Sequence, residues 1–148
     1  GQRLGGAAKN YRVTMSDFSV YTAGQIADWM SQGTVASPPT NLYVAVFDDT
    51  GTERSGDFVN DRVSTAAGTD WTIVSTGFES AVQVDFGDAS VDVNNLQDVA
   101  LYDDTLANGG NEIARYPMTD APFSVASGTS LVFAAGDISF DVQDNTEA

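Results

Sequence analysis

The sequence predicts an all-β domain, an antiparallel β-sandwich of the jelly-roll type, with one short N-terminal helix and an extended N-terminal arm. Short apolar runs rich in β-branched and aromatic residues recur along the chain, with alternating polar positions. Glycine- and aspartate-rich turns separate them at intervals of roughly ten residues, a spacing typical of sandwiches and jelly rolls. Only one segment has helical periodicity, and it precedes all the strand-like runs.

Residues 1–14 form a compositional unit of their own, because they carry three cations, Arg3, Lys9 and Arg12, and no acid. The rest of the chain is strongly acidic, so we divide the sequence into an extended basic arm (1–14) and a helix plus β-sandwich domain (15–148). We expect the three cations to dock the protein on an acidic partner. The alternative is that 1–14 is an extension preceding a natural start at Met15.

The pattern over 16–32 predicts an amphipathic helix. Its apolar residues recur at three- and four-residue spacings: Phe18, Tyr21, Ile26, Trp29 and Met30. Ser16 or Thr22 could cap its start, and Gly33 its end. We expect the apolar face to pack against the sheet, since the polar face has no cation that would suit a membrane surface.

The first strand is predicted within 38–49, where two prolines end the helix and an apolar run follows. This run lacks polar alternation, so we expect the strand to be buried on both faces. Further strands are predicted at 58–64, 71–76, 81–86, 99–102, 113–118, 130–134 and 138–142. The sequence Asn-Gly-Gly-Asn at 108–111 is predicted to form a hairpin turn.

Charge restricts the functions that the domain can have. The chain has 21 acids against 6 bases, no histidine, and Lys9 as its only lysine. Such a surface stays hydrated and soluble in concentrated salt, which favours a halophilic source over an ordinary acidic protein. It would repel nucleic acid, and no apolar run is long enough for a membrane helix.

The absence of histidine and cysteine from the sequence excludes the common serine triad and zinc sites built on those ligands. The remaining candidates are two aspartate pairs, 48–49 and 103–104, which end two predicted strands and could share a loop edge. Such an edge could hold a divalent cation or a glycosidase pair, but solubilising turns are the simpler interpretation. We therefore expect a protein without enzymatic activity or cofactor.

Exposed aromatic side chains could stack on sugar rings, or could fill the core and interfaces of a sandwich. The candidates are Trp29, Tyr43, Trp71, Tyr102 and Tyr116.

The segment 33–49 (GTVASPPTNLYVAVFDD), preceded by a helix, resembles the start of a small accessory structural protein of tailed viruses, a family often labelled tail-fibre or virion protein. In that family a short helix ends in glycine, passes through Thr/Ser-Pro-Pro and enters a strand of the type Leu-Tyr-Val-Ala-Leu-Phe. The likeness continues in order at 51–56, 81–86, 99–103 and 127–136, and covers residues 16–142. Two departures are the segment 58–63, where the family has aromatic-Ala-Arg, and the arm.

This resemblance implies a non-enzymatic, oligomeric virion component on the outer surface of a capsid or tail. We therefore expect a symmetric homo-oligomer, a trimer or pentamer, that decorates the capsid, forms a turret or belongs to a tail fibre. Arg3, Lys9 and Arg12 would attach it to a neighbour such as the major capsid protein. The alternative is a carbohydrate- or receptor-binding adhesion module. Neither nucleic acid nor membrane is an expected partner.

Overall fold

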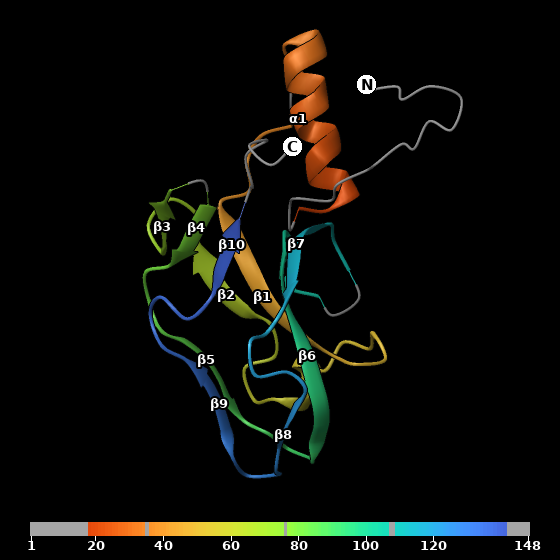
Figure 1. Cartoon of the computed structure of the whole chain (residues 1–148), viewed down its shortest axis with the longest axis vertical. Helices are drawn as coiled ribbons and strands as arrows, with labels where there is room; N and C mark the ends of the chain where they lie inside the picture. Colours follow the sequence, from red (N-terminus) through yellow and green to blue (C-terminus); the bar gives the residue numbers. More distant parts are fainter. Residues whose placement is uncertain (1–17, 35, 76, 107–108, 142–148) are drawn as a thin grey trace, which may run out of the picture.

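The computed structural model describes residues 18–34, 36–75, 77–106 and 109–141. Within these ranges a single α-helix, α1 (Val20–Gln32), stands above a body made of strands (Figure 1). The strands are β1 (Asn41–Asp48), β2 (Val63–Ala66), β3 (Trp71–Val74), β4 (Gly77–Ser80), β5 (Val84–Asp88), β6 (Val93–Tyr102), β7 (Glu112–Pro117), β8 (Phe123–Val125), β9 (Ser130–Phe133) and β10 (Ser139–Asp141).

The described strands form three antiparallel sheets. The largest has the order β2-β1-β6-β7, with β8 also paired to β6, and the others are β10-β4-β3 and β5-β9. Every strand pair is antiparallel. The predicted all-β antiparallel sandwich with one short helix is therefore confirmed.

Strand β1 lies at the centre of the largest sheet and is buried on both faces, as predicted. Val44 and Val46 face the main core, whereas Ala45 and Phe47 pack with Ala100 on the opposite face. This second face is small, and two arginine side chains lie over its aromatic rings. The remainder of the fold is arranged around β1 and its long neighbour β6.

The strand predicted at 58–64 is wrong for most of its length. A short 3-10 turn, η1 (Ser55–Asp57), precedes a loop in which Asp61 has a φ of 52°, a left-handed conformation that interrupts an extended strand. Phe58 forms only an isolated bridge with Ala89, and β2 begins at Val63. The burial of Phe58 explains why the segment has the composition of a strand.

Other boundaries differ by a few residues. Strand β5 begins at Val84 rather than residue 81, and β6 begins at Val93 rather than residue 99. Strands β4 and β8 were not predicted. The 108–111 turn lies partly outside the described residues, but Gly110 has a φ of 74°, as the predicted turn requires.

The helix is shorter than predicted and does not pack on a sheet face. Ser19 caps its start, accepting a hydrogen bond from the Thr22 N–H, and Gly33 ends it in a left-handed conformation as expected. No residue of α1 is buried. Its first turn is held at the edge strand β7, where the Ser19 N–H and the Thr22 hydroxyl both donate to the Ile113 carbonyl at 3.0 Å. Because the anchor is a strand edge, the helix extends away from the body (Figure 1).

Candidate interaction surfaces

The predicted docking residues Arg3, Lys9 and Arg12 lie outside the described residues, as does the rest of the arm. Their role and the division at residue 14 therefore remain predictions. No helix in the described part of the chain is long and apolar enough to cross a membrane.

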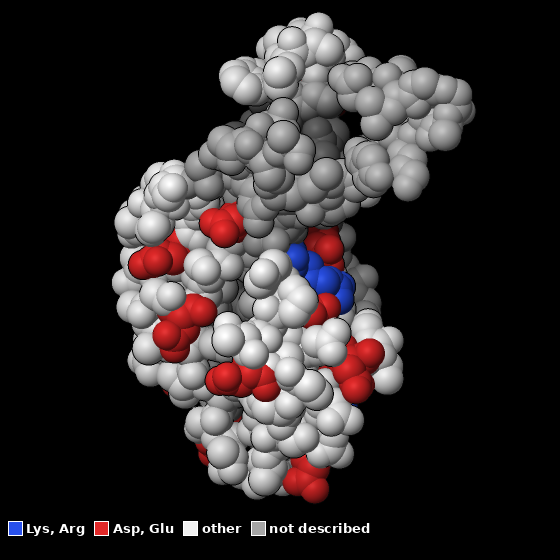
Figure 2. All heavy atoms as spheres, in the orientation of Figure 1, with Lys and Arg blue, Asp and Glu red and all other residues white. Residues whose placement is uncertain are grey.

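All three arginines of the described residues are paired with carboxylates. Arg54 contacts Asp57 at 2.6 Å and Asp48 at 3.5 Å, and Arg115 contacts Glu112 at 2.7 Å. Figure 2 shows acidic atoms spread over the visible face of the body, while basic atoms occupy a single area beside acidic ones. The described surface thus offers carboxylates rather than cations to a partner.

The third arginine, Arg62, holds two loops together from inside the protein. Its guanidinium forms two 2.8 Å contacts with the Glu53 carboxylate, and both side chains are almost fully buried. It also donates to the Asp104 and Gly109 carbonyls at 2.7 and 3.1 Å, and lies 3.9 Å from the centre of the Tyr102 ring. Burial acts to lower the pKa of Arg62, but the hydrogen bond and charge of Glu53 outweigh it and raise that pKa.

The two aspartate pairs do not share a loop edge, contrary to the expectation from sequence. Strands β1 and β6 are antiparallel, with Tyr43 opposite Tyr102 and Asp48 opposite Leu96, so the two pairs follow opposite ends of the ladder. Among the described residues, no three acidic side chains are grouped so that they could hold a metal ion. The shared edge that suggested a cation site is therefore absent, and cation binding stays a prediction.

Instead, one aspartate of each pair stabilises the turn that follows its own strand. The Asp48 carboxylate accepts hydrogen bonds from the Thr50 and Thr52 N–H groups at 2.9 and 3.0 Å and from the Thr50 hydroxyl at 2.6 Å. Burial acts to raise the pKa of Asp48, but these bonds outweigh it and lower that pKa below the ordinary 3.8. Asp103 accepts from the Asn111 N–H at 2.6 Å and thereby closes the β6–β7 loop.

Only two of the five aromatic side chains proposed for sugar stacking are largely exposed, Trp29 at 61% and Tyr116 at 51%. Trp71 packs against Phe78 and donates to the Thr65 hydroxyl at 2.8 Å, so it belongs to the core. Tyr102 lies beneath Arg62. Tyr43 is partly buried in β1.

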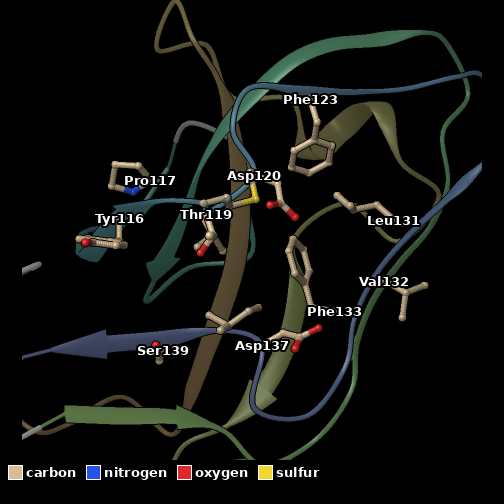
Figure 3. A pocket seen from close by; sticks show the side chains of 13 residues that line it. Tyr116, Pro117, Thr119, Asp120, Phe123, Leu131, Val132, Phe133, Asp137 and Ser139 are labelled. Atoms are coloured by element: carbon tan, nitrogen blue, oxygen red, sulfur yellow. The ribbon is translucent and has the colours of Figure 1, made fainter.

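Tyr116 borders a cleft of about 460 Å³ between the segment that follows β7 and the β9–β10 region. Figure 3 shows Asp120, Phe123, Leu131 and Phe133 pointing into the same space. The cleft is lined by Val99, Tyr116, Pro117, Met118, Thr119, Asp120, Phe123, Leu131, Val132, Phe133, Asp137, Ile138 and Ser139. It thus combines apolar and aromatic walls with two carboxylates and no cation.

A second surface lies on α1, where large apolar side chains are exposed to solvent. Val20 is 91% exposed and Met30 75%, and Ile26 and Trp29 lie beside them. On another side of the helix, the side-chain oxygen Oε1 of Gln25 accepts a hydrogen bond from the Ala36 N–H at 2.9 Å and holds the 36–39 segment nearby. Of the apolar residues predicted to face a sheet, Ile26, Trp29 and Met30 therefore face solvent. Phe18, which precedes the helix, packs against the main core as expected, and Tyr21 is half-buried.

Sequence analysis did not identify the cleft or Arg62. Phe123 and Phe133 lie on different strands, and Asp120 and Asp137 follow different strands, so only the tertiary structure brings them together. Arg62 lies between Asp61 and Val63, and arginine is usually exposed, so the sequence has no local signal of its burial.

A family model described as "Podophage GP4 fiber I protein gp80" matches residues 17–141. The match includes α1 and all the described strands, and begins after the basic arm. No curated protein matches the chain. Since the match extends over most of the sequence, the chain belongs to the family of the podophage GP4 fibre I protein gp80.

Proposed function

We propose that this chain is a non-enzymatic structural subunit of a phage virion fibre, carried on the outer surface of the particle. The observation that supports this function is the family match over residues 17–141. It agrees with the sequence resemblance to structural proteins of tailed viruses, which is confirmed at the level of the family. Head decoration, a turret and a tail fibre all remain compatible positions for such a subunit.

The basic arm is our candidate for attachment to the particle. The family match starts at residue 17, so the arm is outside the shared region. The described arginines are already paired with carboxylates, which leaves Arg3, Lys9 and Arg12 as the cations available to an acidic neighbour such as the major capsid protein. Arginine suits this role because it can contact a carboxylate through two parallel hydrogen bonds.

Deleting residues 1–14 should leave a folded protein that no longer joins particles. A full-length variant with Arg3, Lys9 and Arg12 all changed to Gln should also fail, since attachment depends on charge. Copies per particle can be measured by quantitative mass spectrometry of purified virions. Circular dichroism is the control for folding, and incorporation of either variant at the wild-type level would refute the docking role.

We further propose a host that lives in concentrated salt, and a symmetric homo-oligomer, a trimer or pentamer. The body is acidic and contains no lysine, because Lys9 is in the arm. At about 1 M salt the Debye length falls to about 3 Å, so repulsion between like-charged subunits is largely screened. An acidic subunit of this kind assembles more readily in brine than in dilute buffer.

A second candidate function is adhesion through a glycan, and the cleft beside Tyr116 is the observation that favours it. A sugar ring has an apolar face that can stack on Phe123 or Phe133, and hydroxyl groups that can donate to Asp120 and Asp137. The volume of about 460 Å³ lies within the usual range for small-ligand sites. Anionic sugars are disfavoured, because the cleft has carboxylates and no lining cation.

A glycan array at high salt tests this candidate. We expect a neutral glycan to bind in the cleft, with Tyr116 at the rim of the cleft. Tyr116→Ala and Asp120→Ala should each weaken binding about tenfold or more, because the first removes an aromatic contact and the second a hydrogen-bond acceptor. Asp49→Ala, an exposed aspartate in the β1–η1 loop, is the matched control and should not change binding. Because these contacts need no metal ion, adding a chelator should not change glycan binding. An array without any bound glycan would reject adhesion through this cleft.

A further inference from the structure

Helix α1 presents a continuous apolar stripe that nothing in the described chain covers. The stripe consists of Val20, Ala23, Ala27 and Met30, spaced three, four and three residues apart, with Ile26 along its border. This is the spacing of the a and d positions of a heptad repeat. All five residues are exposed.

An uncovered helix of this length is not expected to be stable alone. Isolated helices shorter than roughly 12–15 residues are marginal in water, and α1 has 13 residues with none buried. Its N-terminal cap and C-terminal glycine help at the ends, but most helical stability in proteins comes from packing of an apolar face. No described residue provides that packing for the stripe, so its burial against a partner would stabilise the helix.

The structure also fixes the direction in which the stripe points. The first turn is held at β7 through the Ile113 carbonyl, and Gln25 is held to the 36–39 segment. At 3.6 residues per turn, Gln25 lies on nearly the opposite side of the helix from Ala27. The stripe accordingly faces away from the body, on a helix that stands clear of it (Figure 1).

The charge pattern of α1 indicates which kind of partner can cover the stripe. Helix α1 has a single charged residue, Asp28, and it lies outside the stripe. An anionic membrane would find no cation there, and a basic partner would find only one carboxylate. Copies of this chain repel one another through their acidic bodies, so the nearly uncharged helix is where two copies can approach with the least repulsion. The two alanines allow the helix backbones to come close together.

We propose that this stripe is the surface through which copies of the chain associate, with their α1 helices parallel around a symmetry axis. The same stripe on every copy provides the self-complementary patch that a cyclic oligomer needs. The parallel orientation rests on the proposed fibre function, because subunits of a fibre attached at one end must point in the same direction.

Disulfide cross-linking tests the geometry, since the wild-type chain has no cysteine. Ala27→Cys places a thiol in the stripe, where parallel copies bring the two sulfurs together. Asp28→Cys, one residue further along, places the thiol outside it. Under mild oxidation we expect covalent dimers of Ala27→Cys on non-reducing gels and only background from Asp28→Cys. Equal yields from both variants would overturn the proposal.

Light scattering coupled to size-exclusion chromatography tests the energetics in 1 M salt. Ala27→Glu and Gln32→Glu both add a negative charge to α1, but only the first puts it in the stripe. We expect Ala27→Glu to weaken self-association about tenfold or more, because an unpaired carboxylate would be desolvated, and Gln32→Glu to have no comparable effect. A wild-type chain that is monomeric at every concentration would overturn the proposal, as would an oligomer whose mass Ala27→Glu leaves unchanged.

The experiments distinguish an error in the α1 interface from an error in the proposed fibre function. If Ala27→Glu remains an oligomer and joins particles, the fibre function stands and the α1 interface is wrong. If the wild-type chain never joins particles, the fibre function fails whatever the gels show. A wild-type monomer that forms a complex only with another virion protein would assign the stripe to that protein and overturn self-association.

Discussion

Replacing Arg62 with alanine is expected to lower the free energy of unfolding by about 3–5 kcal/mol, the usual effect of breaking a buried ion pair. Arg62 is 3% exposed, and its removal leaves the buried Glu53 carboxylate without its arginine. The Asp104 and Gly109 carbonyls lose the same donor, and the Tyr102 ring loses its covering guanidinium. Urea denaturation followed by circular dichroism measures the change.

Arg54→Ala is the matched control, because Arg54 is also in an ion pair but lies near the surface. Exposed pairs contribute at most about 1 kcal/mol, so this variant should be much more stable than Arg62→Ala. Arg62→Lys should recover only part of the loss, since an ammonium cannot reproduce the paired contacts with Glu53. Equal stability of the two alanine variants would show that the buried position of Arg62 contributes nothing.

Phe140→Ala is expected to lower the free energy of unfolding by about 3–5 kcal/mol, because it leaves a cavity in the main core. Phe140 is 1% exposed and its ring centre lies 5.6 Å from that of Phe78 and 6.3 Å from that of Trp71. It also occupies the middle of β10, opposite Phe78. The substitution therefore weakens both the aromatic cluster and the contact between the last strand and the core.

Tryptophan fluorescence during urea denaturation provides the measurement. In a Trp29→Phe background Trp71 is the only tryptophan, and it reports directly on the cluster. Ile73→Ala is the control, since Ile73 lies on β3 of the same sheet but is 79% exposed, and we expect a change within about 0.5 kcal/mol. A Phe140→Ala protein as stable as this control would mean that the core collapses to fill the cavity.

The fold class could be predicted because its signals are local. The uninterrupted apolar run in β1 indicated burial on both faces, and alternation in 138–142 indicated a strand with one buried face. Strands β4 and β8 escaped detection because Gly77 begins the first and Pro122 immediately precedes the second, and both residue types usually indicate turns. The segment at 58–64 has the composition of a strand but is held by long-range contacts in a loop conformation.

The interaction surfaces could be predicted only in part, since periodicity shows that a helix has an apolar face but not what covers it. The pattern in α1 was correctly identified, and its docking on a sheet was wrong because Ser19 and Thr22 attach it to the edge of β7. Similarly, the placement of Asp48 and Asp103 depends on the register between β1 and β6, for which the sequence gives no local signal.

The pairing of the body's arginines also affects which peptide bonds a protease can cleave in the folded protein. Trypsin cleaves after arginine and lysine, and the described residues contain such sites only at Arg54, Arg62 and Arg115. Each of these side chains is engaged by a carboxylate, and Arg62 is buried. The chain's other cleavage sites are Arg3, Lys9 and Arg12. Native trypsin digestion is therefore expected to leave the body whole, and cleavage at Arg62 should follow only once the body unfolds.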